Sequence, residues 1–313
     1  MDYTQLGATG LRVSVMGLGA GGHSRLGMAR GATKEQAAAL VRRALDLGAN
    51  LIDTAEAYRT EEAVGIGIAG RDRDALVIST KVAPRQGDRL LTPGELLERA
   101  EGCLRRLGID HVEVLNLHGV SPDDYPYARE ALVPALLRLR DQGKIRCLGI
   151  TEEFIADPGH RMLSLALRDD CWQVMMVGFN LLNPSARERV LPRTLARGIG
   201  VLCMFAVRTA LSRPEALAPT LEALRQRGQL GESALEAEEP LGFLTDGGAA
   251  ASLVEAALRF CRHEPGVDAV LSGTGSIEHL ERNARAILGP PLPEAALARL
   301  ARAFGRSDSV SGE

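Results

Sequence analysis

Three ionisable side chains end three consecutive apolar runs in this chain. The run NLID ends at Asp53, LVISTK ends at Lys81 and VEVLNLH ends at His118. Tyr58 follows the aspartate by five residues, close enough to fold back over the same place. If the runs are neighbouring parallel strands, their carboxyl ends meet at one mouth and the four side chains gather there. A carboxylate, an ammonium, a phenol and an imidazole in one place are suited to proton transfer.

Each member of this set has a distinct chemical use. The ordinary pKa of a tyrosine is about 10, so proton donation at neutral pH needs support. A lysine ammonium about 4 Å away can supply about 4 kcal/mol at an effective dielectric constant near ~20. We therefore expect Tyr58 to be the general acid, assisted by Lys81 and Asp53. His118 is expected to position a carbonyl oxygen by a hydrogen bond. The pattern predicts no nucleophile with a base and no metal site.

A repeated junction predicts the elements that position these side chains. Four times a helical pattern ends at a glycine and an apolar run begins within a few residues. Glycine adopts the left-handed C-cap conformation without a Cβ clash, and the short run after it is typical of a buried strand. Capping boxes at Thr33 and Thr92 predict two helix starts. The four glycines are Gly48, Gly108, Gly143 and Gly198.

The expected strands are spread along the whole chain. Eight strands alternating with helices predict an α/β fold, a (β/α)8 TIM barrel, better than a doubly wound sheet. We expect one barrel domain over residues 1–305, with DYTQLGATGL as a short N-terminal hairpin at its bottom and 306–313 as a disordered tail. The strands are expected near residues 13–19, 50–53, 76–81, 112–117, 146–150, 173–177, 199–204 and 268–272.

A glycine-rich stretch invites a different interpretation. Gly17, Gly19 and Gly22 match the G-x-G-x-x-G spacing of a dinucleotide-binding loop. That motif requires a helix directly after the loop and an acidic residue about 20 positions further on. The following HSRLGMARGAT has no helical period, and the first convincing helix starts after Thr33. These features argue against a dinucleotide-binding loop at 17–22.

Composition limits the partners and the compartment. The 37 basic and 40 acidic side chains of this 313-residue chain are nearly balanced, which argues against nucleic acid. The chain has no run of 18 apolar residues and no leader pattern at its N-terminus, so we expect no membrane association. The scattered cysteines are typical of reduced thiols, so we expect a cytoplasmic protein, with its oligomeric state left open. They are Cys103, Cys147, Cys171, Cys203 and Cys261.

The order and spacing of several motifs resemble the aldo-keto reductase family. They are DTAEAY with EEAVG, VISTK, the strand ending in LH, and GKIRCLGIT, and the similarity runs from YTQLGATGLRVS to GTGSIEHLERN. The resemblance implies a (β/α)8 barrel that transfers hydride between a nicotinamide cofactor and a carbonyl or alcohol. It assigns Asp53, Tyr58, Lys81 and His118 to the family's catalytic set, with Tyr58 as general acid. It also implies a cofactor extended across the barrel mouth, without a Rossmann unit, so that 17–22 is a strand end and a flexible loop at that mouth.

The nicotinamide pocket implied by this resemblance departs from the family's pattern. Where the family usually has Ser-Asn to bind the carboxamide, this chain has Thr151 and Glu152. A glutamate accepts from the amide NH₂ but cannot donate to its oxygen. Met176 takes the place of the usual glutamine. Met204, beside Phe205, takes the place of the stacking aromatic, and a thioether can also pack on a ring.

The adenine end of the implied site lies in GTGSIEHLERN. Arg208, in the loop after strand seven, is the expected pyrophosphate partner. A helix beginning near Ser276 can bind phosphate through its backbone N–H groups. Few basic residues remain there to meet a ribose 2′-phosphate, so we expect weak discrimination between the two cofactors. The resemblance implies NADP(H), with NAD(H) as the alternative. The expected cofactor contacts are Gly19, Thr151, Glu152, Met176, Met204, Phe205, Arg208, Gly273, Thr274, Ser276, His279 and Asn283.

Three functions remain open from the sequence. The favoured one is an oxidoreductase that interconverts a small carbonyl compound (aldehyde, ketone or sugar) and its alcohol. The alternative is a non-catalytic or regulatory member with an altered nicotinamide pocket, which the intact four-residue set argues against. A third is a barrel enzyme that performs internal redox chemistry with a retained cofactor. The loops expected at the mouth suit a polar, sugar-like substrate, with His23, Arg25, Tyr125, Tyr127 and Phe205.

Overall fold

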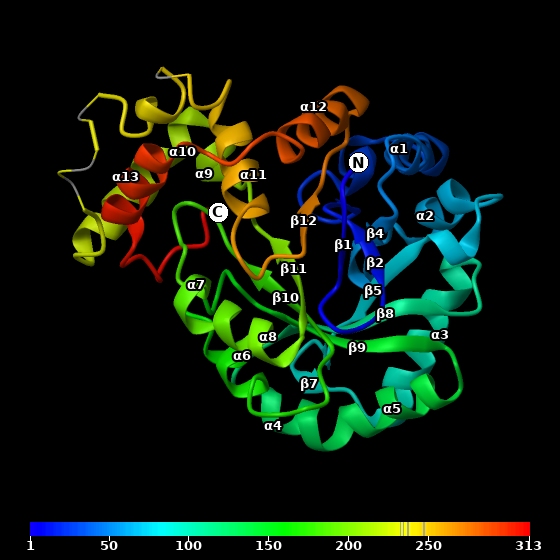
Figure 1. The fold of residues 1–313 in the computed structure, drawn as a ribbon. Helices are drawn as coiled ribbons and strands as arrows, with labels where there is room; N and C mark the ends of the chain where they lie inside the picture. The colour runs from blue at the N-terminus through cyan, green and yellow to red at the C-terminus, as the bar shows by residue number, and fades with distance from the viewer. Residues whose placement is uncertain (232, 234, 237, 247) are drawn as a thin grey trace.

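Parallel strands form a closed barrel wrapped by helices in a computed structural model that describes residues 1–231, 233, 235–236, 238–246 and 248–313 (Figure 1). The barrel strands are β3 (Met16–Gly19), β4 (Leu51–Asp53), β5 (Val77–Val82), β8 (Val112–Val120), β9 (Ile145–Glu152), β10 (Val174–Gly178), β11 (Gly200–Met204) and β12 (Ala269–Ser272). Each strand pairs in parallel with the next, and β12 pairs with β3 to close the ring. This architecture confirms the predicted (β/α)8 TIM barrel.

Local signals explain where the helices begin and end. Thr33 and Thr92 each accept a hydrogen bond from the third helical N–H, and the side chain there accepts one in return, which closes both capping boxes. All four expected glycine stops have positive φ. The helices are α1 (Lys34–Asp46), α2 (Glu61–Ile68), α3 (Pro93–Leu107), α4 (Tyr125–Tyr127), α5 (Val133–Asp141), α6 (Arg161–Ala166), α7 (Ala186–Arg189), α8 (Leu191–Arg197), α9 (Thr209–Ser212), α10 (Pro214–Gln226), α11 (Leu253–Arg262), α12 (Ile277–Ile287) and α13 (Glu294–Phe304).

The bottom of the barrel is closed by the expected N-terminal hairpin. Its strands β1 (Tyr3–Gln5) and β2 (Arg12–Ser14) pair antiparallel. Leu6 and Leu11 are buried against side chains inside the barrel. A Cβ at Gly7 would lie 2.4 Å from the first backbone nitrogen of β11, so the turn needs a glycine to come this close. The hairpin therefore fills the end of the barrel opposite the mouth.

The expected strands agree with the observed ones, with one division. Seven of them overlap the strands of the barrel closely. The first, expected over 13–19, is divided because Ser14 ends the hairpin and its hydroxyl donates to the carbonyl oxygen of Met16 at 2.7 Å. The barrel strand β3 begins only at that methionine.

Alternation along the strands decides which side chains face the interior. On β4, Leu51 lies inside the barrel and Ile52 packs outside against the helices. Asp53 therefore returns to the inner face at the end of the strand. The same period of two places Lys81 of β5 and His118 of β8 on the inner face. The fold thus directs three members of the predicted set to one mouth.

Residues 306–313 are packed in the structure, which differs from the expected disordered tail. The side-chain amides of Asn180 and Asn183 donate to two of its backbone carbonyls at 3.0 and 2.8 Å. The backbone N–H of Ala210 donates to a third at 3.0 Å. The polar composition of the tail predicted disorder, but donors from distant loops satisfy its backbone. Figure 1 shows this end of the chain beside α9.

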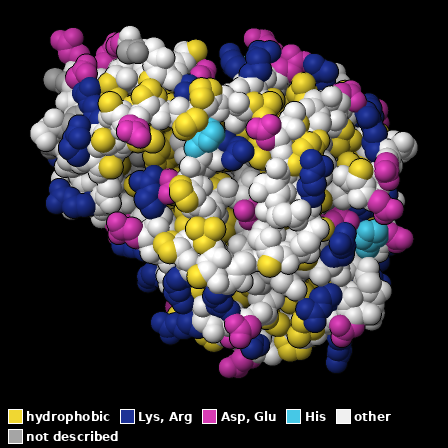
Figure 2. All heavy atoms as spheres, viewed as in Figure 1, with side chains coloured by type: hydrophobic (Ala, Val, Ile, Leu, Met, Phe, Trp, Pro, Cys, Tyr) yellow, Lys and Arg dark blue, Asp and Glu magenta, His cyan; other side chains and the backbone are white. Residues whose placement is uncertain are grey.

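The exterior carries both signs of charge. Lysine and arginine side chains alternate with aspartate and glutamate around the visible face (Figure 2), in keeping with their near-equal numbers in the chain. Among the helices of the described residues, none is long and apolar enough to cross a membrane.

Candidate active site

A buried ion pair stands at the carboxyl ends of β4 and β5. The Nζ atom of Lys81 donates to Oδ2 of Asp53 at 2.5 Å and to the carbonyl oxygen of Thr54 at 2.8 Å. The hydroxyl of Ser79 donates to Oδ1 of Asp53 at 2.9 Å. Lys81 is fully buried and Asp53 is 3% exposed. Hydrogen bonds from several sides therefore offset the cost of removing these charges from water.

The two charges stabilise each other against that cost. Burial lowers the pKa of Lys81, but its interactions with Asp53 and Tyr58 outweigh burial and raise the pKa above its ordinary 10.5. Burial raises the pKa of Asp53, opposed by the charge and hydrogen bond of Lys81. Lys81 is therefore an ammonium at neutral pH, next to the tyrosine.

Tyr58 reaches over this pair from the 3₁₀ turn η2 (Glu56–Tyr58). Its ring centroid lies 4.9 Å from Nζ of Lys81, and its Oη lies 3.3 Å from Nε2 of His118. A Cβ at Gly21 would fall 2.5 Å from the tyrosine ring, so the loop after β3 needs a glycine there. The structure places this loop at the mouth, as expected. The G-x-G-x-x-G spacing did not identify Gly21 as the glycine that the tyrosine ring requires.

His118 is electrically neutral in this environment. Burial and the positive charge of Lys81 lower its pKa from 6.5 to about 3. A neutral imidazole has one N–H to donate and one nitrogen to accept. With the proton on Nε2, it can donate to an oxygen bound beside the Tyr58 hydroxyl. This is the role expected for it from the sequence.

Two supporting side chains were not identified from the sequence. The amide of Asn116 donates to Oγ of Ser79 at 3.0 Å, and that hydroxyl donates to Asp53. Ser79 and Asn116 stand two residues before Lys81 and His118 on the same strands. Residues two apart on a strand share a face. The alternation of polar residues along these strands therefore indicates Ser79 and Asn116, which the positions of the strand ends alone do not.

The set opens into a cleft of about 1210 Å³ across the barrel mouth. Asp53 and Tyr58 line it, whereas Lys81 and His118 do not. Most of the expected cofactor contacts line the same cleft. They are Gly19, Met176, Met204, Phe205, Arg208, Gly273, Thr274, Ser276, His279 and Asn283.

One wall of the cleft is apolar and contains a strained aromatic residue. Met176 and Met204 project into it from β10 and β11. Phe205 follows β11 with a φ of +66°, a conformation that costs a residue with a side chain roughly 1–2 kcal/mol. Its ring contacts Phe154 edge to face at 5.3 Å, and Cζ of Arg208 lies 3.9 Å from its centroid. Strain held by neighbours in this way is common at functional sites.

Another wall is formed by the N-terminus of α12. Oγ of Ser276 accepts from the backbone N–H of His279 at 3.4 Å, and Oγ of Thr274 accepts from the N–H of Ser276 at 3.1 Å. The first-turn N–H groups and the helix dipole favour an anionic group here. Glu278 and Arg30 also line the cleft and add one charge of each sign.

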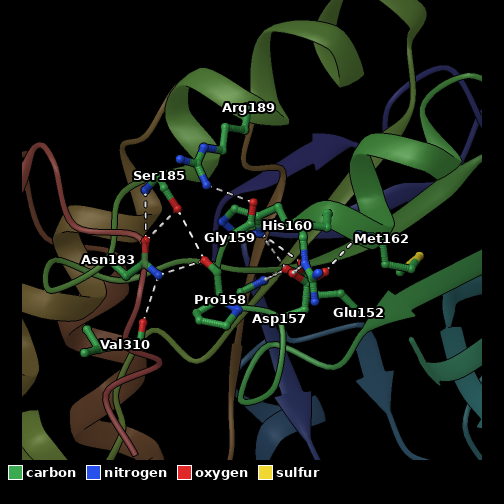
Figure 3. A network of polar contacts seen from close by, with 12 residues as sticks. Glu152, Asp157, Pro158, Gly159, His160, Met162, Asn183, Ser185, Arg189 and Val310 are labelled. Atoms are coloured by element: carbon green, nitrogen blue, oxygen red, sulfur yellow. Dashed lines mark hydrogen bonds and ion pairs between the residues drawn. The ribbon is translucent and has the colours of Figure 1, made fainter. Parts of the chain in front are cut away.

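Two expected cofactor contacts lie outside the cleft, and the structure differs from the expectation there. Oγ of Thr151 accepts from the backbone N–H of Gly119 at 2.7 Å. Glu152 is buried on the outer face of β9, 2.9 Å from Nδ1 of His160, and accepts from the N–H of Gly178 at 2.8 Å (Figure 3). Adjacent strand residues face opposite sides, and here Thr151 and Glu152 are directed to opposite faces of β9.

The Glu152–His160 pair belongs to a separate polar network. Burial raises the pKa of Glu152, against the lowering effect of His160. The imidazole stacks on Phe154 with centroids 5.3 Å apart, and its Nε2 is buried with no hydrogen-bond partner among the described residues. Asn183 donates to the carbonyl oxygen of Pro158 at 3.0 Å and ties this loop to the one after β10 (Figure 3). None of these five residues lines the cleft.

The loop residues expected to meet a substrate divide into two groups. His23 and Phe205 line the cleft, whereas Arg25 does not. The hydroxyl of Tyr125 donates to a carboxylate at 2.6 Å, and that of Tyr127 donates to a backbone carbonyl at 2.9 Å, both away from the cleft. The position of a residue after a strand therefore did not determine the direction of its side chain.

The barrel and the site define the class of protein, an α/β barrel with a buried acid–base set at its mouth. The chain matches the Aldo/keto reductase family over residues 15–303. It is 27% identical over 295 residues to the uncharacterized oxidoreductase YqkF of Bacillus subtilis (strain 168), covering 91% of each chain. It is 31% identical over 157 residues to L-galactose dehydrogenase of Arabidopsis thaliana, covering 48% of each. The holo form of aldo-keto reductase AKR11C1 from Bacillus halodurans has a TM-score of 0.73 at 24% identity, covering 99% of each chain. This chain belongs to the aldo-keto reductase family.

Proposed function

We propose that this protein interconverts a carbonyl compound and its alcohol by NAD(P)(H)-dependent hydride transfer, with Tyr58 as general acid and base. The observation that carries the proposal is the convergence of a phenol, an ammonium and a neutral imidazole at one mouth. The Tyr58 hydroxyl lies 3.3 Å from Nε2 of His118, and the Lys81 ammonium lies 4.9 Å from the tyrosine ring. A carbonyl oxygen between the hydroxyl and the imidazole would meet two hydrogen-bond donors.

Each residue of the set has a part in moving the proton. Tyr58 gives its proton to the substrate oxygen, and the ammonium of Lys81 stabilises the tyrosinate left behind. Asp53 keeps that ammonium in place. The neutral His118 orients the substrate oxygen by a hydrogen bond. A bound reduced nicotinamide would supply the hydride. In the reverse direction the tyrosinate accepts the proton of the alcohol.

The cleft has features that suit the parts of a nicotinamide dinucleotide. The N-terminus of α12 and the guanidinium of Arg208 suit phosphate groups. The thioethers of Met176 and Met204 suit the face of the nicotinamide ring. Thr151 and Glu152 lie outside the cleft, so they would not bind the carboxamide of the nicotinamide. Packing of the nicotinamide ring against the two thioethers would hold it instead.

NADP(H) is the proposed cofactor, with NAD(H) as a close alternative. Arg30 and His279 would favour a ribose 2′-phosphate, whereas the carboxylate of Glu278 would oppose it, so discrimination should be weak. Glu278→Gln should raise the ratio of NADPH to NADH affinity about threefold, the order expected for one exposed charge. Titration of cofactor fluorescence measures both affinities. An unchanged ratio would mean that the 2′ position lies away from this residue.

The proposed substrate is a small polar carbonyl compound of a sugar-like kind. His23 and Ser24 line the cleft in the loop that also packs on Tyr58. Similarity to L-galactose dehydrogenase over about half of each chain supports a polar substrate. A flat lipid would offer these polar groups no hydrogen bonds.

We also propose a cytoplasmic location. The cysteines are free thiols, and four of the five are buried. Thiols without a disulfide framework are typical of a reducing compartment.

The proposal is tested by following hydride transfer directly. The purified protein is mixed with deuterated NADPH or NADH and a panel of polar aldehydes, ketones and sugars, and the alcohol product is analysed for deuterium. Transfer of one deuterium to the carbonyl carbon is the expected result. Cofactor binding without turnover of any compound would favour the non-catalytic alternative. Cofactor absorbance of the protein as purified would favour the retained-cofactor alternative.

A further inference from the structure

The packed tail leads back to the cleft. The side-chain amides of Asn180 and Asn183, which follow β10, donate to two of its backbone carbonyls. Asn183 also donates to a carbonyl oxygen in the loop after β9 (Figure 3). Gly312 has a φ of +85°, and a Cβ there would lie 3.6 Å from Cβ of Arg208. This turn directs the side chain of Glu313 toward the rim of the mouth.

Glu313 bridges two residues that line the cleft. Its Oε2 accepts from Nε of Arg208 at 2.5 Å, and its Oε1 lies 2.7 Å from Nε2 of His23. His23 belongs to the loop after β3, and Arg208 belongs to the loop after β11. The two loops come from strands far apart in the sequence but separated only by β12 in the barrel, and one carboxylate joins them at the rim of the mouth.

Arg208 is well placed to receive an anion in this position. Its side chain is 18% exposed, and its guanidinium is fixed against the face of Phe205 at 3.9 Å. Guanidinium groups bind carboxylates and phosphates with the same planar arrangement of donors. The carboxylate of Glu313 therefore shows where a phosphate oxygen could be held.

We propose that His23 and Arg208 form an anion subsite of the cleft, and that the chain's own Glu313 fills it until the diphosphate of a dinucleotide displaces it. The inference rests on the proposed function, because it takes the dinucleotide to be the ligand of the cleft. The tail then acts as an internal competitor of the cofactor.

Displacement of Glu313 does not require the tail to unfold. The hydrogen bonds from Asn180, Asn183 and Ala210 go to backbone carbonyls of residues 310–312. They stay intact when the glutamate side chain rotates away. The competitor is therefore one side chain held close to its site, and its removal by substitution leaves the anchors in place.

The test compares Glu313→Gln with the parent for binding of inorganic pyrophosphate, NADPH and NADH, by calorimetry at low salt. The variant should bind each about three- to tenfold more tightly, the order expected when one partly exposed carboxylate no longer competes. The gain should shrink at high salt because both loops are solvent-accessible. Asp308→Asn is the matched control. It removes the same charge from the same tail, but Asp308 pairs with Arg189 away from the cleft, so affinity should not change.

The outcomes separate the subsite from the proposed function. Tighter pyrophosphate binding by Glu313→Gln without binding of either dinucleotide would support the subsite and overturn the dinucleotide as the ligand. Unchanged or weaker pyrophosphate binding by this variant, or no measurable pyrophosphate binding by either protein, would overturn the subsite. An equal gain in Asp308→Asn would also overturn it, since the effect would then come from the charge of the tail as a whole.

Discussion

Two buried acid–base pairs stand at the carboxyl ends of barrel strands, and they differ in what they touch. Asp53 and Lys81 are 2.5 Å apart, and Tyr58 connects them to the cleft. Glu152 and His160 are 2.9 Å apart and equally buried, but Phe154 and backbone groups surround them. Two acid–base pairs at similar depth thus have different roles.

The face of the strand explains this difference. Asp53 stands on the inner face of β4, where the barrel opens. Glu152 stands on the outer face of β9, in line with Leu148 and Ile150, which pack against the helices. A buried charge contributes to chemistry when it acts on a group that meets the substrate. The first pair has Tyr58 for this purpose, and the second pair orders a loop.

The largest expected effect concerns the group that connects the first pair to the cleft. Tyr58→Phe should lower turnover at least about a hundredfold, because proton donation accompanies hydride transfer. Steady-state kinetics with a polar aldehyde measures it. Tyr127→Phe is the control, since its hydroxyl bonds a backbone carbonyl away from the cleft. Turnover of the Tyr58 variant within threefold of the parent would remove this residue from its proposed role.

The first pair should act as a unit with the tyrosine. Lys81→Met should lower turnover about as much as Tyr58→Phe, and the double variant should be little worse than either. The reason is that the lysine works through the tyrosine. Single-turnover rates of the three variants test this. If the two losses multiply in the double variant, lysine and tyrosine do not share one proton path.

The second pair should affect stability more than catalysis. Glu152→Gln leaves His160 with a weaker partner in a buried site, so the free energy of unfolding should fall by about 3 kcal/mol. Turnover at saturating substrate should stay within about threefold of the parent. Glu153→Gln, at the exposed neighbouring position, should change neither quantity. A large loss of turnover in folded Glu152→Gln would show that this pair also serves the cleft.

The smallest expected effect is a pH dependence of stability that arises from His118, beside the first pair. The folded protein keeps His118 neutral down to about pH 3, whereas the unfolded chain takes up a proton near the ordinary pKa of 6.5. Acidification therefore favours the unfolded state, and stability present above pH 6.5 is lost as the pH falls toward 3. Between pH 7 and pH 5 the parent should lose about 2 kcal/mol more than His118→Gln. Parallel losses in denaturant titrations of both proteins would contradict the lowered pKa.

The sequence by itself determined the barrel and the residues of the first pair. Helix starts at Thr33 and Thr92 depend on side chains within one turn, so they can be predicted without a structure. Asp53, Lys81 and His118 each end an apolar run, and parallel strands bring such ends together. These features depend on short-range periodicity and on the layout of one common fold.

The tertiary structure alone decided the direction of side chains and the course of the tail. Whether Glu152 faces a cofactor depends on which face of β9 packs against the helices, and its motif position did not fix that. The tail is ordered because Asn180 and Asn183, more than a hundred residues earlier in the chain, donate to its backbone. The contact of Glu313 with His23 and Arg208 likewise joins three distant segments. Such contacts depend on how the chain closes in space, which local patterns do not encode.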